Sequence, residues 1–350
     1  MCNLLIVMKV NDIYLSAPNV QIAANSTSNK EIIRRVEENF KGNVAELKKI
    51  KSGISFVFKY CDTDIRYLGT EEGLKPIDYA LKASENVCRL NGINPSDVDL
   101  VIYGGIFREY FEPATAMEIA SRLNIKSVHA FDVTNACAGL LQSINVASSL
   151  MMADPSIKTA LCCTIDFPDD AINYDIQSFD ELSLKAAGLT LGSGAAAWIL
   201  TRNPLESGCA RLLDIQNTSI PSGYDLCQVS IKDRKFTSQS KQTFELGIKH
   251  VPDEIIRLVE RLNWKINDID FFISHQPSKR IIYQILDILR IDHKKAPITH
   301  HLYGNTVNVS VPMTLDYLLK YDKLKNGHKI ILSSAAAGFT MLTIGAEWVK

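Results

Sequence analysis

The sequence predicts an α/β fold built from two similar halves within one chain of 350 residues. Apolar runs of strand length alternate with amphipathic helical segments, a pattern typical of largely parallel sheets with right-handed crossovers. Segments of the first half recur in the same order in the second half. With 46% hydrophobic and 22% charged residues and a net charge of −1, the composition excludes an acidic disordered chain and argues against nucleic-acid binding.

Four segments carry the repeat, and each combines a helix end or turn with a buried strand. In the first half they are residues 89–103, 120–133, 158–163 and 186–199. Their counterparts in the second half are residues 261–273, 286–299, 329–334 and 336–349. We expect strands at residues 100–103, 131–133, 271–273 and 297–299. Four matches in one order indicate a duplicated unit rather than coincidence.

The boundary between the halves falls near Asn203-Pro204, which divides the chain into residues 1–202 and 203–350. Only the first half has an Asp-rich insertion, residues 166–185. Long loops of this kind often form lids or subunit contacts. The apolar run at residues 4–8 is too short for a signal sequence or a membrane span, so we expect it to be an opening strand.

Eight cysteines occur without a spacing that would bind metal or form a redox pair. None belongs to a CxxC pair, and no histidine lies at a zinc-finger distance from any of them. The sequence therefore predicts no metal site, and we expect reduced thiols in a cytoplasmic protein. The cysteines are Cys2, Cys61, Cys88, Cys137, Cys162, Cys163, Cys209 and Cys227.

The two halves differ at three places where chemistry can occur. Cys137 lies at an elbow between a strand and a helix, and Asn305 holds the equivalent place in the second half. His275 follows the strand at residues 271–273, where the first half has two glycines. A helix N-terminus favours a thiolate, so we expect a lowered pKa for Cys137. A Cys–His–Asn cluster can accept an acyl group and hold an enolate oxygen.

Each of these residues also has a plain structural interpretation. A cysteine after a strand is most often a packing residue, and a histidine at a strand end is usually a satisfied core or surface residue. The repeat favours catalysis. It is identified from other segments of the chain, and it independently brings these three residues together. The adjacent pairs His300-His301 and Cys162-Cys163 diverge along the chain, which argues against metal binding by either pair.

Four motifs resemble those of the thiolase superfamily, nearest to its ketoacyl-ACP synthase III branch. In chain order they are Asn-Ala-Cys-Ala-Gly, His-Gln-Pro-Ser-x-Arg, Tyr-Gly-Asn-Thr and Ala-Gly-Phe-Thr. The resemblance covers nearly the whole chain. It implies the thiolase fold, which is a five-layered αβαβα arrangement of two similar halves with internal pseudo-twofold symmetry, and a homodimer. It also implies acyl-CoA or acyl-carrier-protein thioesters as substrates, with neither a metal nor a cofactor.

The same resemblance implies roles for individual residues. Cys137 would be the acylated nucleophile, and His275 and Asn305 would bind the enolate oxygen. The backbone N–H groups of Cys137 and Gly338 would form the oxyanion hole of the acyl-transfer step. Arg280 is similar to an arginine that contacts the phosphopantetheine donor or its carrier, although a solvated charge on a helix face would look the same.

A finer resemblance concerns residues 108–116, 131–137 and 189–197. They are similar to the acyl-CoA condensing enzyme of bacterial long-chain olefin biosynthesis. In that enzyme a glutamate, here matched by Glu112, reaches the site from the partner subunit and removes an α-proton. Ordinary ketoacyl-ACP synthase III enzymes lack this carboxylate because they form the carbanion by decarboxylating a malonyl thioester. Alternatively, Glu112 caps a helix that begins at Pro113.

Some positions depart from the family pattern. Ser278 stands where ketoacyl-ACP synthases usually have asparagine, alanines at 335–337 replace a glycine run, and the CoA-binding arginine and tryptophan are not evident at residues 51–60. The leading hypothesis is a non-decarboxylative Claisen condensation of two acyl thioesters that gives a β-ketoacyl product. The alternatives are decarboxylative condensation with a malonyl thioester, simple acyl transfer, and a non-enzymatic partner subunit. The intact Cys–His–Asn set disfavours the last.

Overall fold

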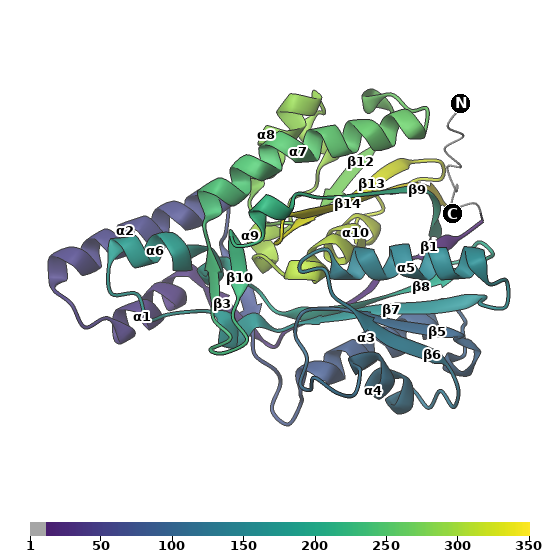
Figure 1. Ribbon diagram of the computed structural model, residues 1–350, viewed down its shortest axis with the longest axis horizontal. Helices are drawn as coiled ribbons and strands as arrows, with labels where there is room; N and C mark the ends of the chain where they lie inside the picture. The colour runs from purple at the N-terminus through teal and green to yellow at the C-terminus, as the bar shows by residue number, and fades with distance from the viewer. Residues whose placement is uncertain (1–11) are drawn as a thin grey trace.

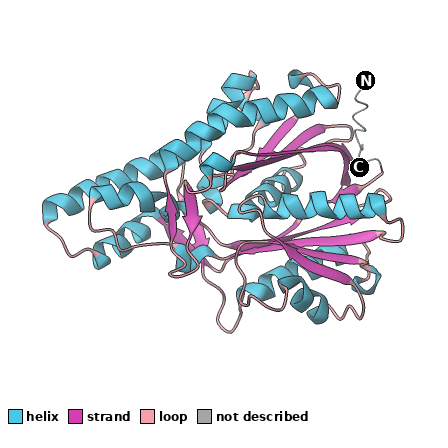
Figure 2. Ribbon diagram, viewed as in Figure 1, coloured by secondary structure: helices cyan, strands magenta, loops and turns pink. Residues whose placement is uncertain are grey.

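Two β-sheets lie face to face, with helices between them and on both outer sides, so the chain forms the five layers of an αβαβα arrangement (Figure 1, Figure 2). The structure is a computed structural model that describes residues 12–350. The strand expected at residues 4–8 lies outside the described residues. The α/β fold class predicted from the sequence is confirmed.

The first half builds the lower sheet of Figure 1, in the order β6-β5-β7-β8-β1. β5 pairs in parallel with β6 and β7, whereas β8 runs antiparallel to β7. α3 and α4 cover the outer face of this sheet, and α5 lies between the two sheets. The elements are β1 (Tyr14–Ser16), β2 (Asn19–Ile22), α3 (Pro76–Leu90), β5 (Leu100–Gly104), α4 (Thr115–Arg122), β6 (His129–Val133), α5 (Gly139–Ala153), β7 (Thr159–Asp166) and β8 (Gly194–Thr201).

The second half builds the upper sheet, in the order β12-β13-β14-β9. β12 and β13 are parallel, and β14 runs antiparallel to both β13 and β9. β1 pairs with β8 on one side and β9 on the other, which joins the sheets. The elements are β9 (Cys209–Ser219), α7 (Ser240–Arg261), β12 (Phe271–Ser274), α8 (Lys279–Leu289), α9 (His300–Tyr303), α10 (Ser310–Lys320), β13 (Lys329–Ala336) and β14 (Thr340–Val349).

An extension at the left of Figure 1 contains α1, α2 and α6, the strand pair β3-β4 and the hairpin β10-β11. The insertion at residues 166–185 contributes α6 and the short 3-10 helix Pro168–Ala171. α6 packs against α2 and against β11 of the hairpin. The elements are β3 (Asn25–Ser28), α1 (Asn29–Asn39), α2 (Val44–Cys61), β4 (Ile65–Leu68), α6 (Phe179–Lys185), β10 (Cys227–Val229) and β11 (Phe236–Ser238).

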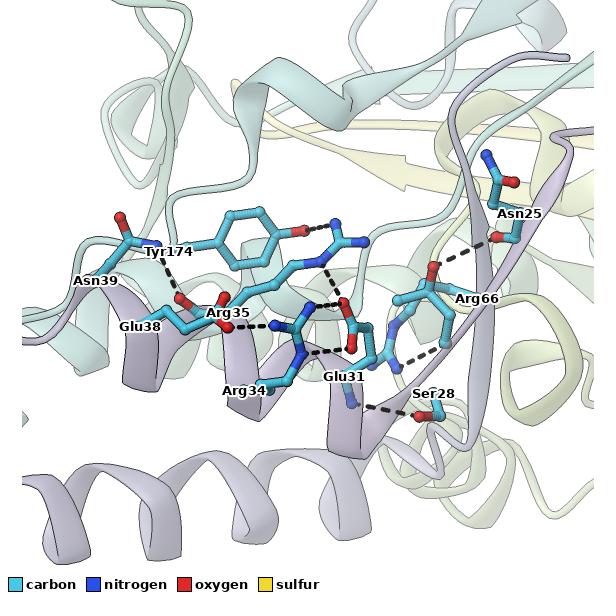
Figure 3. Close-up of polar contacts among 10 residues, drawn as sticks. Asn25, Ser28, Glu31, Arg34, Arg35, Glu38, Asn39, Arg66 and Tyr174 are labelled. Atoms are coloured by element: carbon cyan, nitrogen blue, oxygen red, sulfur yellow. Dashed lines mark hydrogen bonds and ion pairs between the residues drawn. The ribbon is translucent and has the colours of Figure 1, made fainter. Parts of the chain in front are cut away.

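Polar contacts tie the insertion to α1 (Figure 3). Glu31 accepts hydrogen bonds from Arg34 at 2.7 Å and from Arg35 at 3.1 Å. The Arg34 and Arg35 guanidinium groups lower the pKa of Glu31 to about 2. Arg35 also donates to the hydroxyl of Tyr174, within the insertion, at 3.3 Å. The start of the extension is therefore held to the loop that only the first half contains.

Gly53 lets α6 close tightly against α2. A Cβ at this position would lie 2.6 Å from Cδ2 of Leu182 and 2.9 Å from Cε2 of Phe179. Real Cβ atoms do not approach neighbours so closely, so any larger residue would push the two helices apart or displace these side chains.

The two sheets repeat the same strand pairing. Leu100 of β5 lies beside Ala160 of β7, and Phe271 of β12 lies beside Ile330 of β13. Ala160 is therefore the structural equivalent of Ile330. The sequence alignment of residues 158–163 with 329–334 is one residue out of register.

The strand expected at residues 297–299 is wrong, because this segment has no strand conformation. The side chain of Gln276 takes the place of a neighbouring strand. Its Nε2 donates to the carbonyl of Pro297 at 3.3 Å, and its Oε1 accepts from the N–H of Thr299 at 3.2 Å. A side chain that supplies both bonds satisfies this backbone without a ladder.

One segment within residues 12–350, Ala136–Ala153, is long and apolar enough to cross a membrane by length and composition alone. It consists of α5 and the turn before it, and half of it is buried inside the fold. Leu140, Ile144 and Met151 belong to the hydrophobic core between the sheets. Packing between two sheets accounts for its apolar character.

Candidate active site

An apolar cavity of about 680 Å³ contains the three residues predicted to be catalytic. Cys137, His275 and Asn305 all line it, although they come from three separate segments of the chain. Its volume lies within the range of about 300–1,000 Å³ that is usual for small-molecule sites. Most of the other lining side chains are apolar and come from the extension, α7 and α8, among them Phe56, Phe179, Leu182, Phe244, Ile281 and Ile285.

Cys137 lies at the expected elbow between β6 and α5. Ala136, directly before it, has a φ of +45°, a strained conformation for a residue with a side chain. Gly104 lets the elbow pack backbone to backbone, since a Cβ there would lie 2.4 Å from the Gly139 carbonyl oxygen. Ser334 donates to the Cys137 carbonyl at 2.8 Å. Contacts from both halves therefore fix the elbow.

Two backbone N–H groups, those of Cys137 and Ala337, lower the pKa of the Cys137 thiol. The N–H groups of Ala138 and Gly139 are used within the turn. Within residues 12–350, no backbone hydrogen bond uses the N–H of Cys137.

Gly338, predicted to complete the oxyanion hole, directly follows Ala337 in the turn between β13 and β14. Its φ of +121° is a conformation that favours glycine, and a Cβ there would meet no atom within 4 Å. In this turn, the amide that lowers the pKa of the Cys137 thiol is that of Ala337. The role of the Gly338 amide therefore stays a prediction.

Burial reverses the expected effect of the helix N-terminus on the Cys137 thiol. The apolar cavity raises the pKa of this thiol above its usual range, because a thiolate would be poorly solvated there. Cys227 and Asp166 raise it further, and the two backbone N–H groups lower it by less. The lowered pKa expected from the sequence is wrong, and Cys137 needs a base when it attacks.

His275 is a neutral imidazole whose tautomer is set by Ser310. Burial lowers the pKa of His275 to about 4. Ser310 donates its single hydroxyl proton to the carbonyl of Val307 at 2.6 Å. Its oxygen, 3.0 Å from Nδ1 of His275, must therefore accept the Nδ1 proton. In this arrangement Nε2 carries a lone pair and can accept a proton.

Asn305 presents its amide N–H₂ as the free end of its side chain. Its Oδ1 accepts from the N–H of Val307 at 3.0 Å, which leaves Nδ2 to donate elsewhere. Its main chain is held at both ends, since its N–H bonds the carbonyl of Thr190 at 2.8 Å and its carbonyl accepts from Gly192 at 2.9 Å. Asn305 is therefore a fixed hydrogen-bond donor on the cavity wall.

Glu112 lies outside the cavity of its own chain, on an exposed turn between β5 and α4. It is not the helix cap considered as an alternative. α4 begins at Thr115, and the Asp132 carboxylate accepts from the N–H groups of Thr115 and Ala116, both at 2.9 Å. A single chain therefore does not bring Glu112 to Cys137.

Arg280 lies in the first turn of α8, beside the cavity. Its guanidinium carbon is 5.0 Å from the ring centroid of Tyr60 on α2, and Tyr60 lines the cavity. Next to it, Lys279 forms an ion pair with Asp62 at 3.1 Å. Arg280 itself is exposed and free to meet a ligand.

Sequence reasoning missed the residues that orient the site. Ser310 and Asn308 lie within five residues of Asn305, and Ala337 precedes Gly338, so nearness to a motif was the available signal. Asp166 carried no signal beyond its place at the end of a strand and the start of the insertion.

Two family models match the chain and together cover just over half of it. The model described as 3-Oxoacyl-[acyl-carrier-protein (ACP)] synthase III matches residues 131–219, and the model of its C terminal region matches residues 259–348. The first segment contains Cys137, and the second contains His275 and Asn305. The chain belongs to the ketoacyl-ACP synthase III-like branch of the thiolase superfamily. It is therefore a condensing acyltransferase.

Relatives and solved structures agree with this family. The β-ketoacyl-[acyl-carrier-protein] synthase III of Clostridium perfringens is 28% identical over 297 residues, which span 81% of this chain and 87% of that protein. Cerulenin-bound OleA of Xanthomonas campestris superposes with a TM-score of 0.87 at 23% identity, covering 98% of both chains. FabH of Pseudomonas aeruginosa superposes with a TM-score of 0.81 at 21% identity, covering 97% of this chain and 99% of that chain. At these identities the solved structures show the fold.

Proposed function

We propose that the chain joins two acyl thioesters by a Claisen condensation without loss of CO₂, through an acyl-Cys137 intermediate. The observation that carries this proposal is the meeting of Cys137, His275 and Asn305 in one apolar cavity of about 680 Å³. Because each buried methylene contributes about 0.8 kcal/mol, such a cavity favours long acyl chains. The product would be a β-ketoacyl compound.

In the first step Cys137 takes an acyl group from acyl-CoA or an acyl carrier protein. The sulfur bonds to the thioester carbonyl carbon, and the bond from that carbon to the carrier sulfur breaks. Nε2 of His275 accepts the thiol proton and passes it to the departing thiolate. The tautomer of His275 supports this role, since its Nε2 lone pair is free. The N–H groups of Cys137 and of the Ala337-Gly338 turn would hold the oxyanion.

In the second step Glu112 removes an α-proton from the second acyl thioester. The enolate oxygen accepts from Nδ2 of Asn305. His275 becomes a second donor in its other neutral tautomer: between the two steps the ring gives its Nδ1 proton to water and takes a proton on Nε2 from water, so its total protonation is unchanged. Ser310 then turns its hydroxyl proton toward Nδ1. The enolate carbon attacks the acyl carbonyl, the Cys137 sulfur leaves, and the proton taken by Glu112 restores the thiol.

If Glu112 is the base, a second copy of the chain must bring it to the cavity. β6 is the edge strand of the sheet, paired only with β5 within residues 12–350. Beside Glu112, Phe111 is 82% exposed, and Met117 of α4 is exposed as well. An open strand edge with exposed apolar side chains favours association with another chain. We infer a homodimer in which Glu112 enters the cavity of the partner.

The position of Arg280 supports a role in binding the carrier of the thioester. A guanidinium group beside the cavity suits a phosphate of CoA or of phosphopantetheine. Replacing Arg280 by glutamate should raise KM for the acyl thioester and leave kcat nearly unchanged. An unchanged KM would assign Arg280 to the solvated helix face.

The test of the proposal uses a single long-chain acyl-CoA with no malonyl thioester, followed by mass spectrometry of the products and of the protein. The wild type should release a β-ketoacyl product containing two chains, and Cys137→Ala should release none. Glu112→Ala should still acquire an acyl group on Cys137 yet form no product. Glu109→Ala, a neighbouring exposed glutamate paired with Lys75, is the matched control and should condense normally.

Decarboxylative condensation is the second candidate. It is favoured by the exposure of Glu112 in its own chain and by relatives named as β-ketoacyl-[acyl-carrier-protein] synthases. In that case product would form only with a malonyl thioester, labelled CO₂ would be released from it, and Glu112→Ala would keep full activity. This combination of results would reject the non-decarboxylative proposal.

A further inference from the structure

Asp166 is a carboxyl group buried beside the two elbows. It is the last residue of β7 and is fully buried. Three neutral groups donate to it: Thr164 Oγ1 at 3.2 Å, the backbone N–H of Asn308 at 3.1 Å and Nδ2 of Asn308 at 3.4 Å. Asp166 is therefore held by hydrogen bonds rather than as one half of an ion pair.

Asn308 carries the contact from Asp166 to α5. Its Oδ1 accepts from the N–H of Leu140 at 3.1 Å. Leu140 is in the first turn of α5, where N–H groups have no partner within the helix. Asn308 lies in the 3-10 helix Val307–Val309 that leads into α10. One side chain thus joins the two helices that start at the two elbows.

The contact connects equivalent positions of the duplicated fold. Leu140 lies three residues after Cys137, and Asn308 lies three residues after Asn305. Because Ala160 is equivalent to Ile330 in the sheets, Asp166 is equivalent to Ala336, which lines the cavity. The two halves therefore differ here, with a hydrogen-bonding carboxyl in one and a methyl group in the other.

Asp166 and the N–H of Leu140 together fix which way the amide of Asn308 faces. Burial raises the pKa of Asp166 well above its usual range, and the hydrogen bonds from Asn308 and Thr164 act against this shift. As a carboxylate Asp166 only accepts hydrogen bonds, which matches the observed amide, whose Nδ2 faces Asp166 and whose Oδ1 faces Leu140. With the amide reversed, two oxygens would meet at Asp166 and two N–H groups would meet at Leu140. Each mismatch would leave buried polar groups unsatisfied, which is destabilising.

We propose that Asp166 is a positioning residue that fixes the Cys137 elbow relative to the Asn305 elbow through Asn308. The inference rests on the proposed function, in which the acyl group on Cys137 and the enolate held by Asn305 must meet. The nucleophile and the enolate donor come from different halves of the chain. A misplacement of about 1 Å between reacting groups can lower a rate on the order of 100-fold.

The test reverses the donor and acceptor roles of the pair. Asp166→Asn sets an N–H₂ group against Nδ2 of Asn308, and Asn308→Asp sets two carboxylates against each other. The double variant Asp166→Asn/Asn308→Asp restores every contact, because the new carboxylate accepts from Leu140 and from the new amide. Asp154→Asn makes the same substitution at the exposed far end of α5 and is the matched control.

Two measurements report on positioning. Single-turnover acylation of Cys137 at saturating acyl-CoA should fall about 10- to 100-fold in Asp166→Asn, with an unchanged half-saturating concentration. Hydrogen exchange of the Leu140 amide should accelerate in the same variant, since only Asn308 protects it. The double variant should recover the acylation rate to within about threefold of wild type, and it should recover the slow exchange. Asp154→Asn should match wild type in both.

The proposal is overturned if Asp166→Asn acylates and exchanges as wild type does, or if a folded double variant is no better than the single variants. Should Asp166→Asn fail to fold, the double variant decides alone: recovered acylation supports the proposal, and failure to fold or to acylate rejects it. If wild-type Cys137 takes no acyl group at all, the proposed function fails, whereas the exchange of Leu140 still decides the positioning role.

Discussion

Replacing Ser310 by alanine should slow the acylation of Cys137 without weakening thioester binding. Ser310 is fully buried, and its oxygen accepts the Nδ1 proton of His275. Without that acceptor, the tautomer with its proton on Nε2 competes, and in this form the ring cannot take the thiol proton. Burial holds Cys137 as a thiol, so the acylation step needs a base and should become slower when His275 cannot accept the proton.

The structure sets the size of the expected effect. The two hydrogen bonds of Ser310 measure 3.0 Å to Nδ1 of His275 and 2.6 Å to the carbonyl of Val307. One such bond contributes about 0.5–1.5 kcal/mol. The Val307 carbonyl stays near the ring and compensates in part. A net loss of about 1.4 kcal/mol corresponds to a tenfold slower step, so we expect acylation to fall about 3- to 30-fold.

The assay is a quenched single turnover with acyl-CoA, read by the mass of the intact protein over a range of substrate concentrations. Ser148→Ala, which removes another buried hydroxyl group farther along α5, is the control and should acylate at the wild-type rate. A Ser310→Ala rate within twofold of wild type, or a loss seen only as a higher half-saturating concentration, would refute the assignment of the tautomer.

Acid should destabilise the fold through two buried imidazoles. Burial lowers the pKa of His275 and His300 from 6.5 to about 4. The unfolded chain therefore binds more protons between these values, and the free energy of unfolding falls as the pH drops through this window, by about 3 kcal/mol per ring. Denaturant unfolding at neutral pH and near pH 4 measures this drop in the free energy of unfolding. In His300→Gln the drop should be about half as large as in the wild type, because only His275 remains. An equal drop in both proteins would contradict the lowered pKa of His300. Gly53→Val should press on Leu182 and shorten the longest acyl chain found on Cys137 with a panel of straight-chain acyl-CoAs; an unchanged chain-length profile would remove α2 and α6 from substrate selection. Alkylation of Cys137 by iodoacetamide should be slow at neutral pH and rise into the alkaline range, whereas a plateau reached by neutral pH would show that its pKa is not raised.

The layered α/β fold and the meeting of three residues could be predicted because the sequence repeats itself. Cys137 and Asn305 occupy matching elbows, and His275 ends a strand whose partner in the first half ends in glycine. The repeat and the positions of these residues at elbows and strand ends can be read directly from the order of residues along the chain. They carry over to the sheets, where the pairing of β5 with β7 matches that of β12 with β13.

The failures share one cause, which is a side chain that acts on a segment far away in the sequence. Gln276 replaces a strand at residues 297–299, and Asp132 caps the helix that Glu112 was considered to cap. The pKa of Cys137 goes up because residues from many segments exclude water from its thiol. Such effects depend on tertiary packing, and neither hydrophobic periodicity nor motif spacing records them.

Complementation between two inactive variants tests the central claim most directly. Cys137→Ala lacks the nucleophile, Glu112→Ala lacks the base, and each alone should form no β-ketoacyl product from acyl-CoA. If Glu112 serves the cavity of a second copy, subunit exchange creates mixed dimers with one complete site. The equimolar mixture should then recover about a quarter of wild-type activity, as expected for random pairing in a twofold dimer. A mixture that exchanges subunits yet stays inactive would contradict the account.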